Sequence, residues 1–251
     1  MKVFFGVLIA INRYDLLFEQ ALESILLQEF NDFSIVVVVN GTLIDISLLE
    51  KYRLRNVNFV FTPLERLSFS LDLGLQNIDC EYLVRMDGDD ISYPNRLRVM
   101  YDFIRDNNYP SVCGSWVQEI DLAGNHLRVL KPPCDNEAIR KMLPFSNPFC
   151  HPSVCIKKSD ILKFKGYANG FKSEDYDLWV RMRRDPSIVF RNCSEITLGY
   201  RVGSGMSRGS RQSYAEVAGY RLREFLLHFS LANFAAFIVW SAKCIFLSKR
   251  V

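Results

Sequence analysis

The stretch Glu81-Tyr-Leu-Val-Arg-Met-Asp-Gly-Asp-Asp-Ile-Ser-Tyr-Pro94 joins an apolar run to a dense group of carboxylates. The run from Tyr82 to Met86 predicts a buried strand, and Asp87, Asp89 and Asp90 follow it directly. Carboxylates crowded at a strand end repel one another unless a cation or strong hydrogen-bond donors lie between them. The stretch alone leaves two interpretations open, an acidic turn and a metal site.

Strand and helix patterns alternate upstream of this stretch, and the predicted strands are Val3–Ile11, Phe33–Val39 and Val57–Phe61. The second strand is almost wholly β-branched, which is typical of a parallel sheet covered on both faces. The order predicts a doubly wound, mostly parallel α/β sheet with helices on both faces. Such a sheet brings the strand ends at Ile11, Asn40 and Asp87 to one edge, where ligands bind.

The bulk composition limits the class of protein. With 251 residues the chain can form one α/β domain with a substantial core, and 49% hydrophobic and 24% charged residues are typical of a globular protein. A formal net charge of +3 is too small to indicate nucleic-acid binding. Seven scattered cysteines without a CxxC pair favour reduced, cytoplasmic thiols over disulfides or zinc. The apolar N-terminus predicts a first strand rather than a signal peptide.

A second acidic cluster occurs at Ser173-Glu174-Asp175-Tyr176-Asp177, where Ser173 is a candidate N-cap of a helix. Asp175 shares a helical stripe with the apolar residues three, four and seven positions later, so we expect it to face the core. Glu174 and Asp177 lie beside or opposite that stripe, where acids merely stabilise a helix start. An inward carboxylate held ionised by the helix N-terminus suits a general base.

Several motifs in order resemble glycosyltransferase family 2. The segment Val84 to Leu97 resembles the DxD segment of that family, and the resemblance covers about residues 3–205. Its other motifs are Asn12 after the first strand, Ser24-Ile-Leu-Leu-Gln28, Asn147-Pro148-x-x-His151-Pro152-Ser153, Gly166-Tyr167 and the pair Glu174-Asp175.

The resemblance implies a GT-A (Rossmann-like) fold, a nucleotide-diphospho-sugar donor, and Mg²⁺ or Mn²⁺ held through the DxD acids. Asp89 resembles the chief metal ligand, and Asp87 contacts the ribose or helps to hold the metal. Asp175 corresponds to the base of an inverting enzyme, with Glu174 as the next candidate. An acceptor hydroxyl requires such a base opposite the leaving diphosphate, whose charge the cation stabilises.

Further contacts are predicted around this centre. The predicted donor-binding residues are Ala10, Asn12, Asn40, Asp72, Arg85 and Asp87. Arg85 either meets the donor phosphates or pairs with the aspartates. His151 is either an acceptor contact or a loop histidine with its own partners. Arg201 and Arg208 belong to a Gly-rich segment that either closes over the diphosphate as a lid or is a solvated basic loop.

The sequence departs from the family pattern at three places. Asn40 stands where an acid commonly contacts the nucleotide base, and Asp72 stands where Asn is usual. A histidine often found after the last strand is replaced within Arg201-Val202-Gly203-Ser204. The identity of the donor and a third metal ligand are therefore not fixed by the motifs.

Two other functions compete with the transferase. A haloacid-dehalogenase-like phosphohydrolase also carries an Asp-x-Asp pair after an apolar strand. That pair normally follows the first strand, whereas three βα units precede it here. The other alternative is a non-catalytic sugar-nucleotide-binding subunit, against which the two acidic clusters argue.

Residues 206–251 form a predicted tail after a catalytic domain at 1–205, beginning with a mobile loop. Phe225–Leu247 is apolar with basic flanks, but Lys243 inside it disfavours a membrane span. The pattern favours an amphipathic helix or helix pair on the membrane surface; the alternative is a helix packed on the catalytic domain or joining a homo-oligomer. Surface attachment would suit a lipid-linked or glycan acceptor at the cytoplasmic face of the inner membrane, in polysaccharide or lipopolysaccharide synthesis.

Overall fold

The structure is a computed structural model that describes residues 2–42, 44–167, 170–203 and 209–246. Its strands are β1 (Val3–Ile11), β2 (Phe33–Asn40), β3 (Val57–Thr62), β4 (Cys80–Asp87), β5 (Ile91–Ser92), β6 (Val112–Ile120), β7 (His126–Leu130), β8 (Cys155–Lys157) and β9 (Phe190–Arg201). Its helices are α1 (Leu16–Leu26), α2 (Glu50–Arg53), α3 (Leu67–Gln76), α4 (Arg96–Asp106), α5 (Asn136–Met142), α6 (Lys158–Lys163), α7 (Glu174–Met182), α8 (Arg211–His228) and α9 (Leu231–Phe246), with short 3-10 turns at Ile46–Leu49 and His151–Ser153.

One sheet runs through the domain in the order β3-β2-β1-β4-β8-β6-β9-β5, with β7 beside β6. The strands β3, β2, β1 and β4 are all parallel, as the alternating pattern predicts. Beyond β4 the sheet is mixed, because β8 runs antiparallel to both β4 and β6. The register of β1 and β4 sets Ala10 beside Asp87, which brings these two strand ends to one edge.

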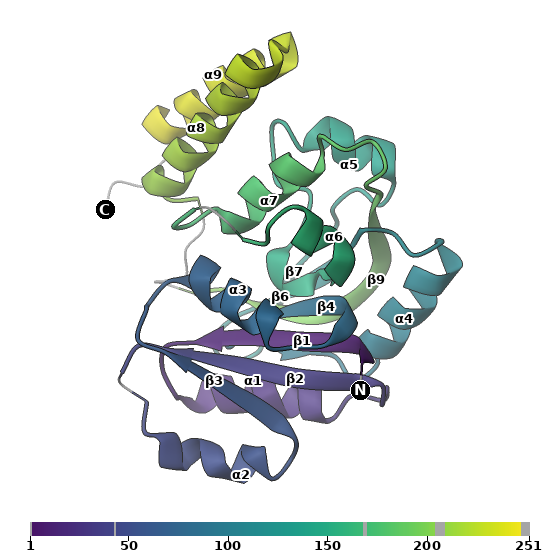
Figure 1. Ribbon diagram of the computed structural model, residues 1–251, viewed down its shortest axis with the longest axis vertical. Coiled ribbons are helices and arrows are strands. Elements are labelled where there is room, and N and C mark those ends of the chain that lie inside the picture. The colour runs from purple at the N-terminus through teal and green to yellow at the C-terminus, as the bar shows by residue number, and fades with distance from the viewer. Residues whose placement is uncertain (1, 43, 168–169, 204–208, 247–251) are drawn as a thin grey trace.

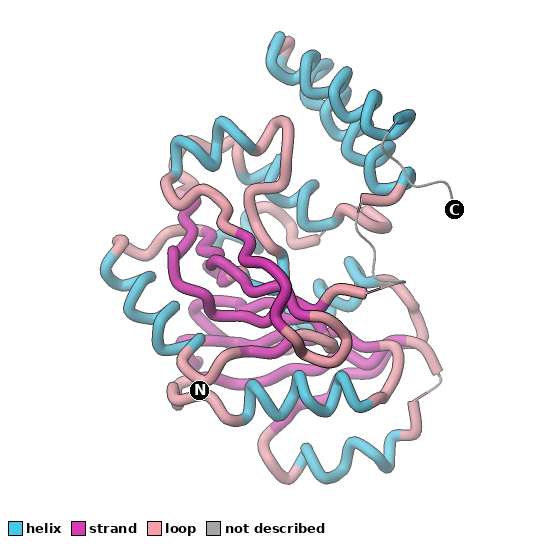
Figure 2. The backbone as a smooth tube through the Cα atoms, turned by 180° about the vertical axis from the view of Figure 1, so that it is seen from behind, coloured by secondary structure: helices cyan, strands magenta, loops and turns pink. Residues whose placement is uncertain are grey.

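Two hydrophobic cores cover the two faces of the sheet. On β1, Val7 and Ile9 belong to the core shared with α1 and α4, while Leu8 points to the opposite core, shared with α3 and α7. Successive strand residues point to opposite faces, so a strand buried on both sides is apolar throughout. Figure 2 shows the helices on either side of the strands. The predicted α/β class is confirmed.

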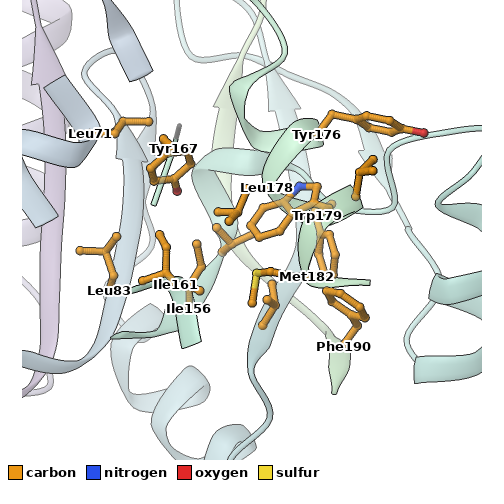
Figure 3. Packing of buried hydrophobic residues seen from close by; sticks show 14 of the residues in the cluster. Leu71, Leu83, Ile156, Ile161, Tyr167, Tyr176, Leu178, Trp179, Met182 and Phe190 are labelled. Carbon is orange, nitrogen blue, oxygen red and sulfur yellow. The ribbon is translucent and has the colours of Figure 1, made fainter. Parts of the chain in front are cut away.

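Helix α7 lies deep in the core that it shares with α3. Leu178, Trp179 and Met182 are buried among residues from the sheet and from α6, as Figure 3 shows. On the other side, α8 and α9 supply Val217 and Trp240 to the same core. The helix is therefore covered on both sides, which a single apolar stripe does not predict.

The C-terminal segment is a helical hairpin that projects beyond α7 in Figure 1. Its two helices meet at Phe229, which has a positive φ of 44°. Trp240 Nε1 donates to the Pro144 carbonyl at 2.9 Å and Lys243 Nζ to the Phe145 carbonyl at 2.7 Å, so α9 contacts the loop after α5. Within the described ranges, no helix has both the length and the apolar character needed to cross a membrane.

Candidate active site

A pocket of about 840 Å³ opens at the carboxyl ends of β1 and β4. Ala10 and Asn12 line it from the end of β1, and Asp87 and Asp89 from the end of β4. The loop before β8, the first turn of α7 and the end of β9 also line it, together with parts of β6 and β7. Parallel strands bring these ends together, as expected for an open α/β sheet.

Three carboxylates cluster at the end of β4, of which Asp87 and Asp89 line the pocket and Asp90 is buried behind them. Asp87, Asp89 and Asp90 each offer an oxygen within 4.8 Å of the others. The backbone N–H of Arg201 donates to Asp90 Oδ1 at 2.7 Å, while Asp90 Oδ2 is buried without a partner among the described residues. Burial and the neighbouring Asp87 raise the pKa of both Asp89 and Asp90. An oxygen cluster of this kind fits a hard divalent cation, which would remove the repulsion.

Arg85 lies on β4 beneath the acids and is almost fully buried. Its guanidinium donates to Asp87, and its Nε and Nη1 have no partner within the described part of the chain. Arg96 Nη2 fixes the backbone of β4 at this point by donating to the Arg85 carbonyl at 2.9 Å. Arg85 therefore pairs with an aspartate and also lines the pocket, so both of its predicted roles agree with its position.

The acidic pair of α7 lies across the same pocket. Asn147 Nδ2 donates to Asp175 Oδ2 and the Tyr176 N–H donates to Oδ1, each at 2.7 Å, which fixes the carboxylate. Burial raises the pKa of Asp175, and both hydrogen bonds oppose that shift. Burial together with the charge of Asp175 raises the pKa of Glu174 to about 7. The two carboxyl groups thus share a site that favours one negative charge near neutral pH.

The helical-stripe argument for α7 was incomplete. Glu174 and Asp177 were expected beside or opposite the core but both are buried, and Asp177 is fully buried because α8 covers that side of the helix. Asp175, expected to face the core, is only half-buried. Asp177 pairs with Arg181 Nε at 2.7 Å and with Arg223 Nη2 at 3.0 Å. Ser173 holds the N-cap position, but its hydroxyl donates to Glu216 at 2.6 Å instead of capping the helix.

His151 also lines the pocket. Its Nε2 lies 3.0 Å from the Tyr167 hydroxyl, and burial, with Arg85 nearby, lowers its pKa well below the usual value. The imidazole is therefore neutral at physiological pH, and it has a structural partner as well as a position at the pocket wall.

Two predicted donor-binding residues do not line the pocket. Asn40 Nδ2 donates to Ser70 Oγ at 2.9 Å, and Asp72 Oδ1 accepts the Tyr167 N–H at 2.7 Å. Both side chains tie α3 to its surroundings, and their contact with the donor stays a prediction. The position of Asn40 at a strand end does not reveal that its side chain will bond to a residue of a neighbouring helix.

Arg201 is not a mobile lid residue. Its Nε donates to the Asp89 carbonyl at 2.6 Å, and its Nη1 donates to the Leu122 carbonyl at 2.9 Å. It is buried at the end of β9, so it holds the DxD turn in place. Arg208 lies outside the described residues.

The pocket is also lined by basic side chains that the motifs did not single out. These residues are Arg13, Arg128, Lys131 and Lys172. Arg13 directly follows Asn12 at the end of β1, a position that could have drawn attention to it. The others come from β7, the segment after it and the loop before α7, where no sequence pattern points to a pocket. Positive charge around an acidic centre suits a phosphate-bearing ligand.

An open α/β sheet with an acidic cluster at its parallel strand ends, and a second acidic pair in the lining of the same pocket, agrees with the GT-A fold of nucleotide-sugar glycosyltransferases that the resemblance implies. The sequence profile described as Glycosyl transferase family 2 matches residues 7–164. The chain belongs to this family. The family assignment argues against the phosphohydrolase alternative.

Named relatives and a solved structure agree with this assignment. The O-antigen biosynthesis glycosyltransferase WbnJ of Escherichia coli is 37% identical over 91% of each chain. A UDP-Gal:alpha-D-GlcNAc-diphosphoundecaprenol beta-1,3-galactosyltransferase of E. coli is 30% identical over 70% of this chain and 66% of its own. S. aureus TarS 1-349 in complex with UDP-GlcNAc has the same fold, with a TM-score of 0.69 at 16% identity over 98% of this chain and 81% of its own.

Proposed function

We propose that this glycosyltransferase inverts the anomeric centre of a nucleotide-diphospho-sugar as it transfers the sugar to a hydroxyl. The observation that carries the proposal is that Asp175 lines the same pocket as Asp87 and Asp89, from a different element. A transfer with inversion needs a base on one side of the anomeric carbon and charge stabilisation on the other.

Asp175 is the proposed base. Its two oxygens accept hydrogen bonds from Asn147 and the Tyr176 N–H, which set its orientation before substrate arrives. A carboxylate that is fixed in this way loses little freedom when it accepts the proton of the acceptor hydroxyl. Glu174 beside it keeps the proton affinity of the pair high, because a second negative charge is disfavoured.

The residues around the strand ends fit a divalent cation. Asp87 and Asp89 would hold Mg²⁺ or Mn²⁺, since oxygen ligands are those both ions accept. The cation supplies charge stabilisation to the departing nucleotide diphosphate. Arg85 holds the Asp87 carboxylate in position from below, while Arg13 and Lys172 face the pocket and are suited to the phosphates.

The names of the relatives suggest the class of acceptor. One relative is named for a diphosphoundecaprenol acceptor and a UDP-galactose donor, and another for O-antigen biosynthesis. We infer a UDP-sugar donor and a lipid-linked glycan acceptor in the synthesis of a surface polysaccharide. The cytoplasmic face of the inner membrane is where donor and acceptor would meet.

The stereochemistry of the product tests the proposed function. The protein is incubated with Mn²⁺, a panel of UDP-sugars and a lipid-diphosphate sugar acceptor, and the new linkage is examined by NMR. Since UDP-hexoses of this kind carry an α linkage, we expect a β-linked product. An α-linked product would contradict the inverting mechanism and the role of Asp175.

Attachment to a membrane surface is the second part of the proposal. The turn of the C-terminal hairpin carries exposed apolar side chains, with Leu231 84% and Phe229 79% exposed. Leu226 and Leu227 precede them and are more than half exposed. We call these four residues the apolar tip. A contiguous apolar patch of this kind marks an interaction surface, and a lipid-linked acceptor makes the membrane its partner.

Flotation with phosphatidylcholine vesicles tests the tip. We expect the double change Leu227→Ser and Leu231→Ser to reduce vesicle binding at least about tenfold, because two apolar side chains no longer enter the lipid. Leu54→Ser is the matched control, since Leu54 is 89% exposed on α2's end, away from the hairpin. Equal binding of the double variant and the control would contradict membrane attachment through the tip.

A further inference from the structure

A second cleft lies between the end of α7 and the turn of the C-terminal hairpin. It has a volume of about 300 Å³, at the lower end of the range for ligand pockets. Three arginines line it, Arg183, Arg184 and Arg221, and Glu224 is the carboxylate in its lining. Arg183 at the C-cap of α7 lies eight residues after Asp175, about 12 Å along a helix. The cleft is thus a site of its own.

The positive charge of the cleft is only partly neutralised. Arg184 pairs with Glu224 through Nε at 2.8 Å, which leaves Arg183 and Arg221. Arg221 is 1% exposed; its Nη2 donates to the Leu143 carbonyl and the Tyr176 hydroxyl, each at 2.6 Å, and its Nε has no partner within the described ranges. Among the described residues, neither Arg183 nor Arg221 therefore has a carboxylate partner.

Arg183 has N–H donors that are not used in hydrogen bonds to the described residues. Its Nε donates to the Arg140 carbonyl at 3.1 Å, and its terminal nitrogens bond to none of the described residues. Burial and the positive charges of Arg221 and Arg140 lower its pKa. A guanidinium whose pKa is lowered by burial and by neighbouring positive charges is stabilised by an anion, and its fork matches the oxygens of a phosphate.

The apolar tip adjoins this cleft in the chain. His228 and Ser230 line the cleft, and they alternate with Phe229 and Leu231 of the tip. A phosphate held by the arginines would therefore lie next to side chains that suit hydrocarbon. A ligand with a phosphate head and an apolar chain satisfies both surfaces at once, whereas a free phosphate satisfies only the cleft.

We propose that this cleft binds the phosphate headgroup of an anionic membrane lipid, in which no positive group compensates the phosphate, while the apolar tip enters the hydrocarbon. The proposal rests on the membrane attachment described above and adds the chemical group that is recognised. Because α7 carries Arg183 at one end and Asp175 at the other, a lipid in the cleft would also fix the height of the active-site pocket above the membrane.

Vesicle binding tests the cleft separately from the tip. The full chain and Arg183→Gln are floated with phosphatidylcholine vesicles and with vesicles that also contain phosphatidylglycerol. We expect Arg183→Gln to bind the anionic vesicles about fivefold less than the wild type, the factor expected for one basic residue near an anionic surface, and to bind neutral vesicles equally. Arg53→Gln, an exposed arginine of α2, is the control and should behave as the wild type.

A charge-conserving variant and a soluble anion separate recognition from general attraction. Arg183→Lys keeps the charge but loses the fork, so we expect binding to anionic vesicles to fall toward that of Arg183→Gln. If Arg183→Lys binds anionic vesicles as well as the wild type, or if Arg53→Gln loses as much binding, the site is overturned and only diffuse attraction remains.

Inorganic phosphate tests the alternative ligand. If it raises the melting temperature of the wild type but leaves vesicle binding unchanged, the cleft is assigned to a free phosphate. If the wild type does not bind neutral vesicles, attachment through the tip is contradicted. Unchanged donor turnover in Arg183→Gln would leave the enzyme proposal intact.

Discussion

Asp175→Asn is expected to lower kcat by about 10²–10⁴-fold, the usual contribution of a general base, with little change in donor affinity. Asparagine keeps the shape of the side chain and can still contact Asn147 and the Tyr176 N–H, but it cannot accept the acceptor proton. A base acts only in the transition state, so kcat should fall while the Kd for the UDP-sugar stays near the wild-type value. Initial rates and calorimetric donor titration measure the two quantities.

Glu174→Gln is the matched control, because it removes the neighbouring carboxylate without touching Asp175. The wild-type rate should fall as the pH drops below about 7, since Glu174 has a pKa raised to about 7 and the pair takes up a proton there. In Glu174→Gln the like charge is gone, so the remaining pKa of Asp175 should be lower and the acid limb of the profile should move to lower pH. A variant Asp175→Asn that keeps most of its kcat, combined with an inactive Glu174→Gln, would make Glu174 the base. A wild type that binds donor without any turnover would support a non-catalytic subunit.

The parallel half of the fold could be predicted because its signal is local. Strand β1 is apolar throughout and the strands β2 and β4 are mostly apolar, with helical patterns between them, so chain order and burial both indicate a covered parallel sheet. The mixed half gives no such signal. Strand β8 has three residues and β5 has two, and their partners are far away in the chain. Strands this short are fixed by tertiary pairing rather than by their own sequence.

The candidate site divides along the same line. The positions of Asp87, Asp89 and Asp175 follow from motifs at a strand end and a helix start, both of which are local features. The hydrogen bonds of Asp72 and Arg201 could not be predicted, because their partners lie far away in the sequence. Asp72 bonds to Tyr167, and Arg201 bonds to the carbonyl of Asp89, neither of which is visible before the chain folds.

The C-terminal hairpin shows why an apolar segment can be hard to interpret. Hydrophobicity alone left a membrane surface, a packing partner and a subunit contact open. In the structure one side of the hairpin is buried, with Ala236 and Trp240 in the core beside α7, while the tip stays exposed. Packing on the catalytic domain is therefore present in the structure, and the exposed tip is the part for which membrane contact is proposed. The polar positions Asn233 and Lys243 fall on the buried or hydrogen-bonded side.

Removal of divalent metal should abolish transfer, and Asp89→Ala should reproduce that loss. Asp87, Asp89 and Asp90 present oxygens within 4.8 Å of one another, and burial raises the pKa of Asp89. The stabilisation that a cation gives to a departing diphosphate amounts to several kcal/mol, so we expect a loss of at least about 10²-fold in kcat/KM in the presence of EDTA. Added Mg²⁺ or Mn²⁺ should restore the rate of the wild type but not that of Asp89→Ala.

Thermal unfolding gives a second readout that does not depend on turnover. Mn²⁺ should raise the melting temperature of the wild type, because an ion that binds only the folded chain stabilises it. It should leave Asp89→Ala unchanged, while Asp106→Ala, which removes an exposed carboxylate of α4, should respond as the wild type does. Without metal, Asp89→Ala should be at least as stable as the wild type, since one of three crowded carboxylates is gone. Full turnover in EDTA, or an equal Mn²⁺ response in Asp89→Ala, would mean that the acidic cluster is not the metal site and that Arg85 and its basic neighbours stabilise the leaving group.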